Sequence, residues 1–204
     1  MIKKNLIKAI VWDMGGVILR TEDPKPREKW ATRFGISLSA LTDFVFGNDI
    51  SRQASIGEKP ASAIWEFVAN HFSLTPQDRE LFERDFWVGD RIDERLLEYI
   101  ESLRKDHLTA LLSNAWGDAR QTISDRYPSW NRFDVSIFSA EVKLAKPDPK
   151  IFHYLLNTLR ILPQEAVFVD DMPENVTAAS ALGINGIHFL DTGQTILEID
   201  KLLS

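Results

Sequence analysis

The sequence of 204 residues contains no cysteine, which excludes disulfide bonds, thiolate metal sites and a cysteine nucleophile. It also lacks a run of basic residues and carries a net charge of −6, so we expect no nucleic-acid partner. No apolar stretch approaches the ~20 residues of a membrane-spanning helix, so we expect no membrane partner. The apolar run Ala9–Trp12 is too short for the h-region of a signal peptide. These absences lead us to expect a cytoplasmic protein.

What the sequence does contain is typical of a globular protein. Hydrophobic residues make up 44% of the chain and charged residues 26%. Five short apolar segments predict buried strands, and continuous rather than alternating apolarity is typical of a parallel sheet covered on both faces. They are residues 9–12, 108–112, 135–138, 166–169 and, more weakly, 184–190. Amphipathic segments at 94–105, 149–159 and 173–182 predict intervening helices. This alternation predicts an α/β fold with a doubly wound, Rossmann-like parallel sheet.

The stretch from about residue 21 to residue 90 interrupts this alternation, because its patterns predict helices only. The predicted helices are 25–34, 38–46, 60–71 and 77–87. We therefore predict a core domain formed by residues 1–20 and 91–204, with a helical cap of residues 21–90 inserted after the first strand.

Polar residues gather where the predicted strands end, which is where ligands bind in open α/β sheets. They are Asp13, Gly15, Gly16, Ser113, Asn114, Asp170 and Asp171, with Lys146 ahead of a later helix. A carboxylate can attack phosphorus, and carboxylates are ligands that Mg²⁺ accepts. A lysine, a hydroxyl and loop amides can balance the charge on a phosphoryl group. Glycines let the backbone approach a bound phosphate closely.

Four segments resemble, in order, the four signature motifs of the haloacid dehalogenase-like (HAD) superfamily. They are residues 10–17 (IVWDMGGV), 111–114 (LLSN), 146–152 (KPDPKIF) and 167–175 (VFVDDMPEN). The 100 residues from Asp13 to Ser113 leave room for a cap in the C1 position, whereas the 33 from Ser113 to Lys146 do not. Four ordered motifs at predicted strand ends are far more specific than one.

The resemblance implies a role for each matching residue. Asp13 would be the nucleophile and a Mg²⁺ ligand. The Gly15 carbonyl and Asp170 would complete the direct metal ligands, with Asp171 lying behind them or contacting the metal through water. The phosphoryl group of a small phosphorylated metabolite would be bound by Gly15, Gly16, Ser113, the Asn114 amide and Lys146. Lys146 would also neutralise Asp13.

Position 15 departs from the usual pattern, in which a second aspartate acts as general acid and base. General acid–base assistance contributes about 10²–10⁴ in rate, so its loss should matter most for poor leaving groups. We therefore expect no mutase chemistry. The resemblance also implies that a dehalogenase would have an aromatic residue at position 15 and need no metal, so Gly15 and the pair Asp170 and Asp171 argue against dehalogenase chemistry. The hypothesis that remains is a phosphatase acting on a sugar phosphate, in particular a sugar 1-phosphate. An Asp-x-Gly subgroup similar to bacterial α-glucose-1-phosphatase fits, and residues 56–60 (IGEKP) resemble its cap turn.

Two other functions stay open from the sequence. A glycine at position 15 is compatible with a non-catalytic or regulatory binding protein on a HAD scaffold. It is also compatible with a C–P hydrolase of the phosphonatase kind, which would need a Schiff-base lysine in the cap, such as Lys25, Lys29 or Lys59.

Three further residues each allow a functional and a structural interpretation. Asn175 either bonds the fourth motif or faces solvent, Trp116 either lines the site or packs, and Arg20 either reaches substrate or remains in the linker.

Overall fold

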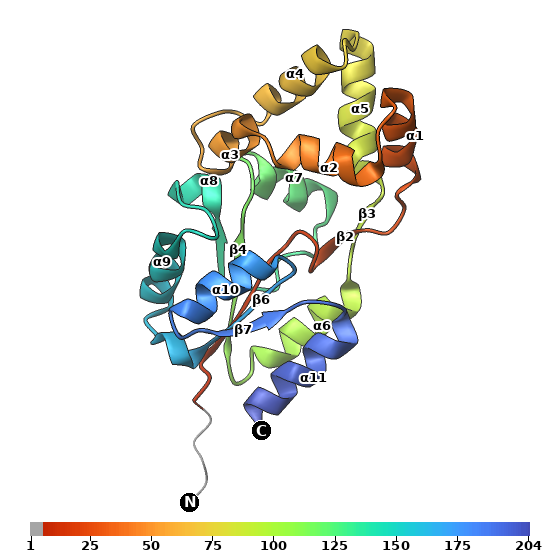
Figure 1. Cartoon of the computed structure of the whole chain (residues 1–204). Helices are drawn as coiled ribbons and strands as arrows, with labels where there is room; N and C mark the ends of the chain where they lie inside the picture. The colour runs from red at the N-terminus through yellow and green to blue at the C-terminus, as the bar shows by residue number, and fades with distance from the viewer. Residues whose placement is uncertain (1–5) are drawn as a thin grey trace, which may run out of the picture.

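The computed structural model describes residues 6–204 and shows a sheet flanked by helices, with further helices beyond one end of it (Figure 1). Residues 1–5 of the predicted core lie outside the described residues. The main sheet has five parallel strands in the order β5-β4-β1-β6-β7. They are β1 (Ala9–Trp12), β4 (Leu108–Ser113), β5 (Val135–Phe138), β6 (Ala166–Asp170) and β7 (Asn185–His188). The predicted α/β fold class is confirmed.

Both faces of this sheet are buried, which explains why its strands are continuously apolar. In β1, Ile10 and Trp12 enter the hydrophobic cluster on one face, while Ala9 and Val11 enter the cluster on the other. Because successive side chains of a strand point to opposite faces, a strand covered twice has no polar side. Buried apolar area on both sides is the main source of stability for such a sheet.

Helices supply the two covering layers. The first face is covered by α6 (Glu94–Leu103) and α11 (Thr192–Leu203), and the second by α9 (Pro149–Leu159) and α10 (Pro173–Ala181). Local capping fixes where they begin: the side chain of Asp93 accepts a hydrogen bond from Leu96 N at the start of α6. The shorter elements are α7 (Ala119–Arg126), α8 (Ser139–Val142) and the 3₁₀ helix η1 (Pro163–Glu165).

The helices at the top of Figure 1 form a group with a hydrophobic cluster of their own. They are α1 (Lys25–Phe34), α2 (Leu38–Phe46), α3 (Asp49–Ser55), α4 (Ser62–His71) and α5 (Pro76–Val88). Side chains of Ser37, Asn48 and Thr75 cap α2, α3 and α5. Within residues 6–204, no helix is both long and apolar enough to cross a bilayer.

A two-stranded antiparallel ribbon joins this helical group to the main sheet. It consists of β2 (Leu19–Thr21) and β3 (Asp90–Ile92), with Thr21 paired opposite Asp90. The expectation of helices alone between residues 21 and 90 is therefore wrong at both ends of that stretch. Three-residue strands are too short to show a periodic pattern in the sequence.

A buried ion pair ties the first helix to this ribbon. Arg27 on α1 donates from Nη2 to both carboxylate oxygens of Asp90, at 2.9 Å each, and from Nε to the Phe86 carbonyl. Thr21 Oγ1 donates to the same carboxylate at 2.7 Å. Arg27 and Asp90 are each less than a tenth exposed. Burial lowers the pKa of Arg27, while the attraction to Asp90 opposes that shift.

We expect Arg27→Ala to lower the free energy of unfolding by about 3–5 kcal/mol, because it leaves the Asp90 carboxylate buried without its cation. Urea unfolding followed by circular dichroism measures the loss. The matched control is Arg33→Ala on the same helix, whose pair with Asp78 is exposed and screened by water. Equal losses in the two variants would contradict a special role for the buried pair.

Candidate active site

Three neighbouring strands of the main sheet end at the same edge and carry predicted site residues there. Asp13 follows β1, Ser113 ends β4, and Asp170 ends β6. Because β1 lies between β4 and β6 and all three strands run parallel, residues far apart in the chain meet at their carboxyl ends.

Lys146, from the loop before α9, joins two of these strand ends. Its Nζ lies 2.8 Å from Asp13 Oδ1 and 2.6 Å from Asp170 Oδ2. All three side chains are buried. The backbone of Lys146 is held in turn by Asn114, whose side chain donates to the Lys146 carbonyl and accepts from the Lys146 amide, both at 2.8 Å. The side chain of Asn114 therefore positions the lysine, which leaves only its backbone amide for the predicted contact with phosphate.

Asp170 is held from three sides. Besides the lysine, Asn175 Nδ2 donates to its two carboxylate oxygens at 3.0 and 3.1 Å, and Met172 N donates to Oδ1 at 2.8 Å. Asn175 is itself buried. The sequence left open whether Asn175 bonds the fourth motif or faces solvent, and the structure shows the bond to the fourth motif.

The carboxylates at this site repel one another, and burial strengthens the effect. Burial raises the pKa of Asp13 to about 7; Lys146 lowers it, and Asp170 and Asp171 raise it. The pKa of Asp171 is also raised, first by burial and then by Asp170. Burial opposes the charged form of Lys146, but the attraction to Asp13 and Asp170 outweighs burial and raises its pKa.

The carboxylates of Asp13, Asp170 and Asp171 fit a divalent metal ion. Each offers an oxygen that lies within 4.8 Å of those of the other two. When all are ionised, these three carboxylates and the Lys146 ammonium leave two negative charges, which one divalent cation balances. Oxygen-only ligands of this kind suit Mg²⁺.

The loop after Asp13 contains two glycines with different constraints. Gly16 has φ of +78°, and a Cβ built on it would lie 2.1 Å from Asp171 Oδ2. At Gly15 a Cβ would meet no atom within 4 Å. Gly16 thus allows the Asp171 carboxylate to approach the loop, whereas the space at position 15 is open.

We expect Gly16→Ala to destabilise the protein by about 1–3 kcal/mol, because it combines a left-handed backbone with a clash against Asp171. Gly15→Ala is the matched control in the same loop and should change stability by less than about 1 kcal/mol. Thermal unfolding of both variants tests this. A larger loss for position 15 than for position 16 would contradict it.

A cavity of about 990 Å³ lies between this edge of the sheet and helices α2–α5. Its lining from the core includes Gly15, Ser113, Asn114, Trp116 and Lys146. From the helical group it includes Phe46, Asp49, Arg52, Trp65, Glu83 and Trp87. Trp116, for which the sequence left two interpretations, lines the cavity and also packs against the helices.

None of the lysines in residues 21–90, a stretch that the structure describes completely, lines this cavity. Lys25, Lys29 and Lys59 are therefore poorly placed for a Schiff base, which counts against C–P hydrolysis of the phosphonatase kind.

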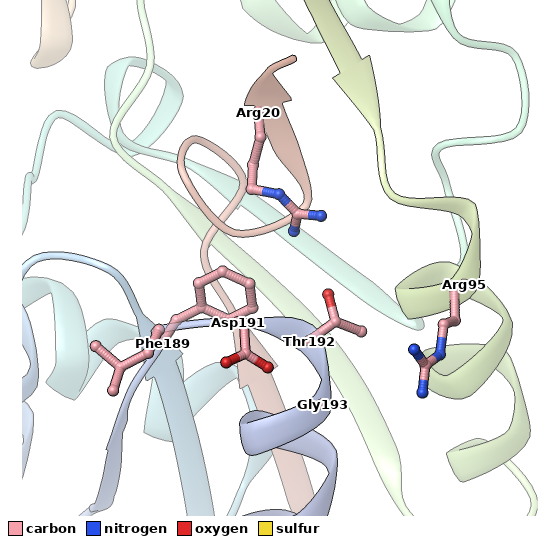
Figure 2. Close-up of a pocket in the computed structure, with 7 residues that line it drawn as sticks. Arg20, Arg95, Phe189, Asp191, Thr192 and Gly193 are labelled. Carbon is pink, nitrogen blue, oxygen red and sulfur yellow. The ribbon is translucent and has the colours of Figure 1, made fainter.

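Arg20 lies away from this cavity and lines a smaller one of about 330 Å³ (Figure 2). Its guanidinium group points toward Phe189 and Thr192, and Arg20 Cζ lies 5.5 Å from the centre of the Phe189 ring. Arg20 Nη2 also lies 2.6 Å from Asp93 Oδ2, and Thr192 donates to the same oxygen. Arg20 thus packs β2 against the start of α6 and the segment after β7, in agreement with its structural interpretation.

Sequence reasoning did not identify Ser139. This buried serine accepts a hydrogen bond from Ala115 N at 2.9 Å and donates to the Ala115 carbonyl, so it fixes the loop after Ser113. Its position at the end of β5 carries no motif that distinguishes it from a helix-start serine.

The family model for haloacid dehalogenase-like hydrolases matches residues 7–183. The chain belongs to this family. A D-ribitol-5-phosphate phosphatase from Bacteroides thetaiotaomicron is 27% identical over 187 residues, covering 87% of this chain and 89% of the relative. A sesquiterpene phosphatase from Aspergillus oryzae is 28% identical over 197 residues, covering 96% of each protein.

Solved HAD structures share the fold. A HAD family enzyme from B. thetaiotaomicron, in complex with magnesium and inorganic phosphate, matches with a TM-score of 0.74 at 20% identity, covering 93% of this chain and 98% of that one. A HAD-like hydrolase from Porphyromonas gingivalis matches with a TM-score of 0.75 at 24% identity, covering 97% and 98%. The family predicted from the four motifs is confirmed.

Proposed function

We propose that this HAD hydrolase is a Mg²⁺-dependent phosphatase that cleaves a small phosphorylated metabolite through an aspartyl-phosphate on Asp13. The observation that carries the proposal is the buried group in which Lys146 contacts both Asp13 and Asp170 while Asp171 lies within metal-binding range. The phosphatases among the relatives and the neighbour solved with magnesium and phosphate support the same chemistry.

Each residue takes a defined part in this proposal. An oxygen of Asp13 forms a bond to phosphorus while the bond from phosphorus to the leaving oxygen breaks, and that oxygen keeps the electron pair. Water then cleaves the aspartyl-phosphate, which releases phosphate and restores Asp13. Mg²⁺, held by Asp13, Asp170, the Gly15 carbonyl and Asp171, would neutralise charge on the phosphoryl oxygens.

The remaining contacts to the phosphoryl group come from Ser113, the Asn114 amide and the loop at Gly16. Lys146 adds a positive charge, and its two ion pairs hold the attacking carboxylate and a metal ligand in fixed relative positions. Residues 21–90 are proposed to act as the cap that bounds the substrate cavity, with residues 1–20 and 91–204 as the core.

The glycine at position 15 limits which esters can react well. Without a general acid, the barrier rises by about 3–5 kcal/mol for a leaving oxygen that needs a proton in the transition state. A sugar 1-phosphate, whose anomeric oxygen leaves more readily, meets this condition. We propose sugar 1-phosphates as the first candidates among sugar phosphates.

We expect the wild-type enzyme to release phosphate from at least one phosphorylated metabolite with Mg²⁺ and not with EDTA. Asp13→Asn should lower kcat by about 10³-fold or more, because the amide is a poor nucleophile. A malachite-green assay over a panel of metabolites measures both. Equal turnover by the variant, or none by the wild type on any ester, would rule out the phosphatase proposal and favour a non-catalytic scaffold.

A second expectation concerns the missing acid. The open space at position 15 should accept Gly15→Asp, and the added carboxyl group should raise kcat on alkyl phosphates more than on sugar 1-phosphates. Steady-state kinetics on glucose 1-phosphate and glycerol 3-phosphate compare the two gains, with Gly15→Ala as the control for the side chain alone. A larger gain on the sugar 1-phosphate would contradict the leaving-group argument.

A further inference from the structure

The lining of the large cavity includes Tyr127 and a cluster of four aromatic side chains that come from four different segments. Phe46 ends α2, Trp65 lies on α4, Trp87 on α5, and Trp116 in the loop after β4. The centre of the Trp116 ring lies 5.6 Å from those of Phe46 and Trp65 and 5.8 Å from that of Trp87. Since Trp116 follows Asn114 by two residues, this aromatic cluster begins beside the proposed phosphate-binding edge.

The rings of this cluster lie at steep angles to one another, and three of them are partly exposed. The plane of Trp116 makes angles of 82° with Trp65 and 74° with Trp87, and those two planes meet at 89°. Phe46 is 42% exposed, and Trp87 and Trp116 are partly exposed, so the cluster keeps ring surface uncovered. A further aromatic ring gains from offset-stacked or edge-to-face contact with such surfaces.

A polyol would gain less from this wall. Each hydroxyl group that it buries needs a hydrogen-bond partner, and a buried hydroxyl group without a partner weakens binding. The lining also includes polar side chains such as Asp49, Arg52 and Glu83, but the four rings of the aromatic cluster offer mainly carbon. The structure thus sets two conditions on the substrate. Gly15 favours a leaving group that departs without a general acid, and the aromatic cluster favours a leaving group that is itself aromatic.

From these two conditions, and resting on the proposed phosphatase function, we infer that the substrate is an aryl phosphate, the monoester of a phenol. A phenol has a pKa near 10, as in tyrosine, so its oxygen leaves as the anion without a general acid. Attack by Asp13 forms the bond to phosphorus, the phenolate departs with the electron pair of the broken bond, and solvent water protonates it. A sugar 1-phosphate meets the first condition alone.

The inference is tested with four esters and Mg²⁺. Phenyl phosphate has a ring and a good leaving group, and benzyl phosphate has a ring and a poor one. Glucose 1-phosphate and n-butyl phosphate are the non-aromatic counterparts. We expect the highest kcat/KM for phenyl phosphate, and we expect Trp116→Leu to raise KM by about tenfold for the two aromatic esters while leaving that of the other two within threefold.

Two variants serve as controls for this measurement. Trp116→Phe keeps a ring and should retain the preference for aromatic esters. Tyr154→Leu removes an exposed aromatic side chain on α9, outside the cavity, and should leave all four KM values unchanged. Trp87→Leu removes a second ring of the same cluster, from α5, so the inference does not depend on one variant remaining folded.

The outcomes separate the inference from the proposed function. If Mg²⁺-dependent turnover requires Asp13 but glucose 1-phosphate is preferred, or if Trp116→Leu and Trp87→Leu change KM equally for all four esters, the aryl assignment is wrong and the phosphatase stands. If neither these esters nor the metabolite panel are hydrolysed, both fail. Selective loss of the aromatic esters in the leucine variants supports the aryl assignment.

Discussion

Lys146 sits between two buried carboxylates, and much of the molecule serves to keep it there. An ammonium group and carboxylates removed from water lose hydration, which only close ion pairs and further hydrogen bonds can offset. The ion pairs are close, because Lys146 Nζ lies 2.8 Å from Asp13 and 2.6 Å from Asp170. Further hydrogen bonds come from two asparagines: Asn114 holds the backbone of Lys146, and Asn175 donates to Asp170. Strand order then matters because it brings β1 and β6 together at this point.

The helical group contributes to the large cavity but not to the buried charged group. The charged group lies at the end of a sheet covered on both faces, which gives it a rigid base. Most residues that line the cavity belong to the core, and helices α2–α5 supply a further part of its wall. These helices have their own hydrophobic cluster and connect through the short ribbon of β2 and β3. The buried pair of Arg27 and Asp90 fixes the helical group to that ribbon. Changes in the helices can therefore alter the cavity without disturbing the charged group.

Local pattern was sufficient for most of the fold. The segments 25–34, 38–46 and 149–159 match α1, α2 and α9, because helical periodicity and clear end signals coincide in them, and the short apolar run 135–138 matches β5. The sequence did not predict β2, β3 or α3, because segments this short show no clear hydrophobic periodicity. Helix α11 was not predicted either; its buried residues Thr195 and Ile199 lie four positions apart, while Leu197 and Leu202 are exposed.

The four motifs were enough to predict the family, the fold class and which charged residues meet at the strand ends. What those residues contact depends on how the folded elements pack. The tertiary structure assigned the side chain of Asn114 to Lys146 and Asn175 to Asp170, and placed Arg20 away from the large cavity. It also brought Trp116 against aromatic rings that precede it by up to 70 residues in the chain. Such contacts depend on the packing of separate elements, and no local pattern of residues specifies that packing.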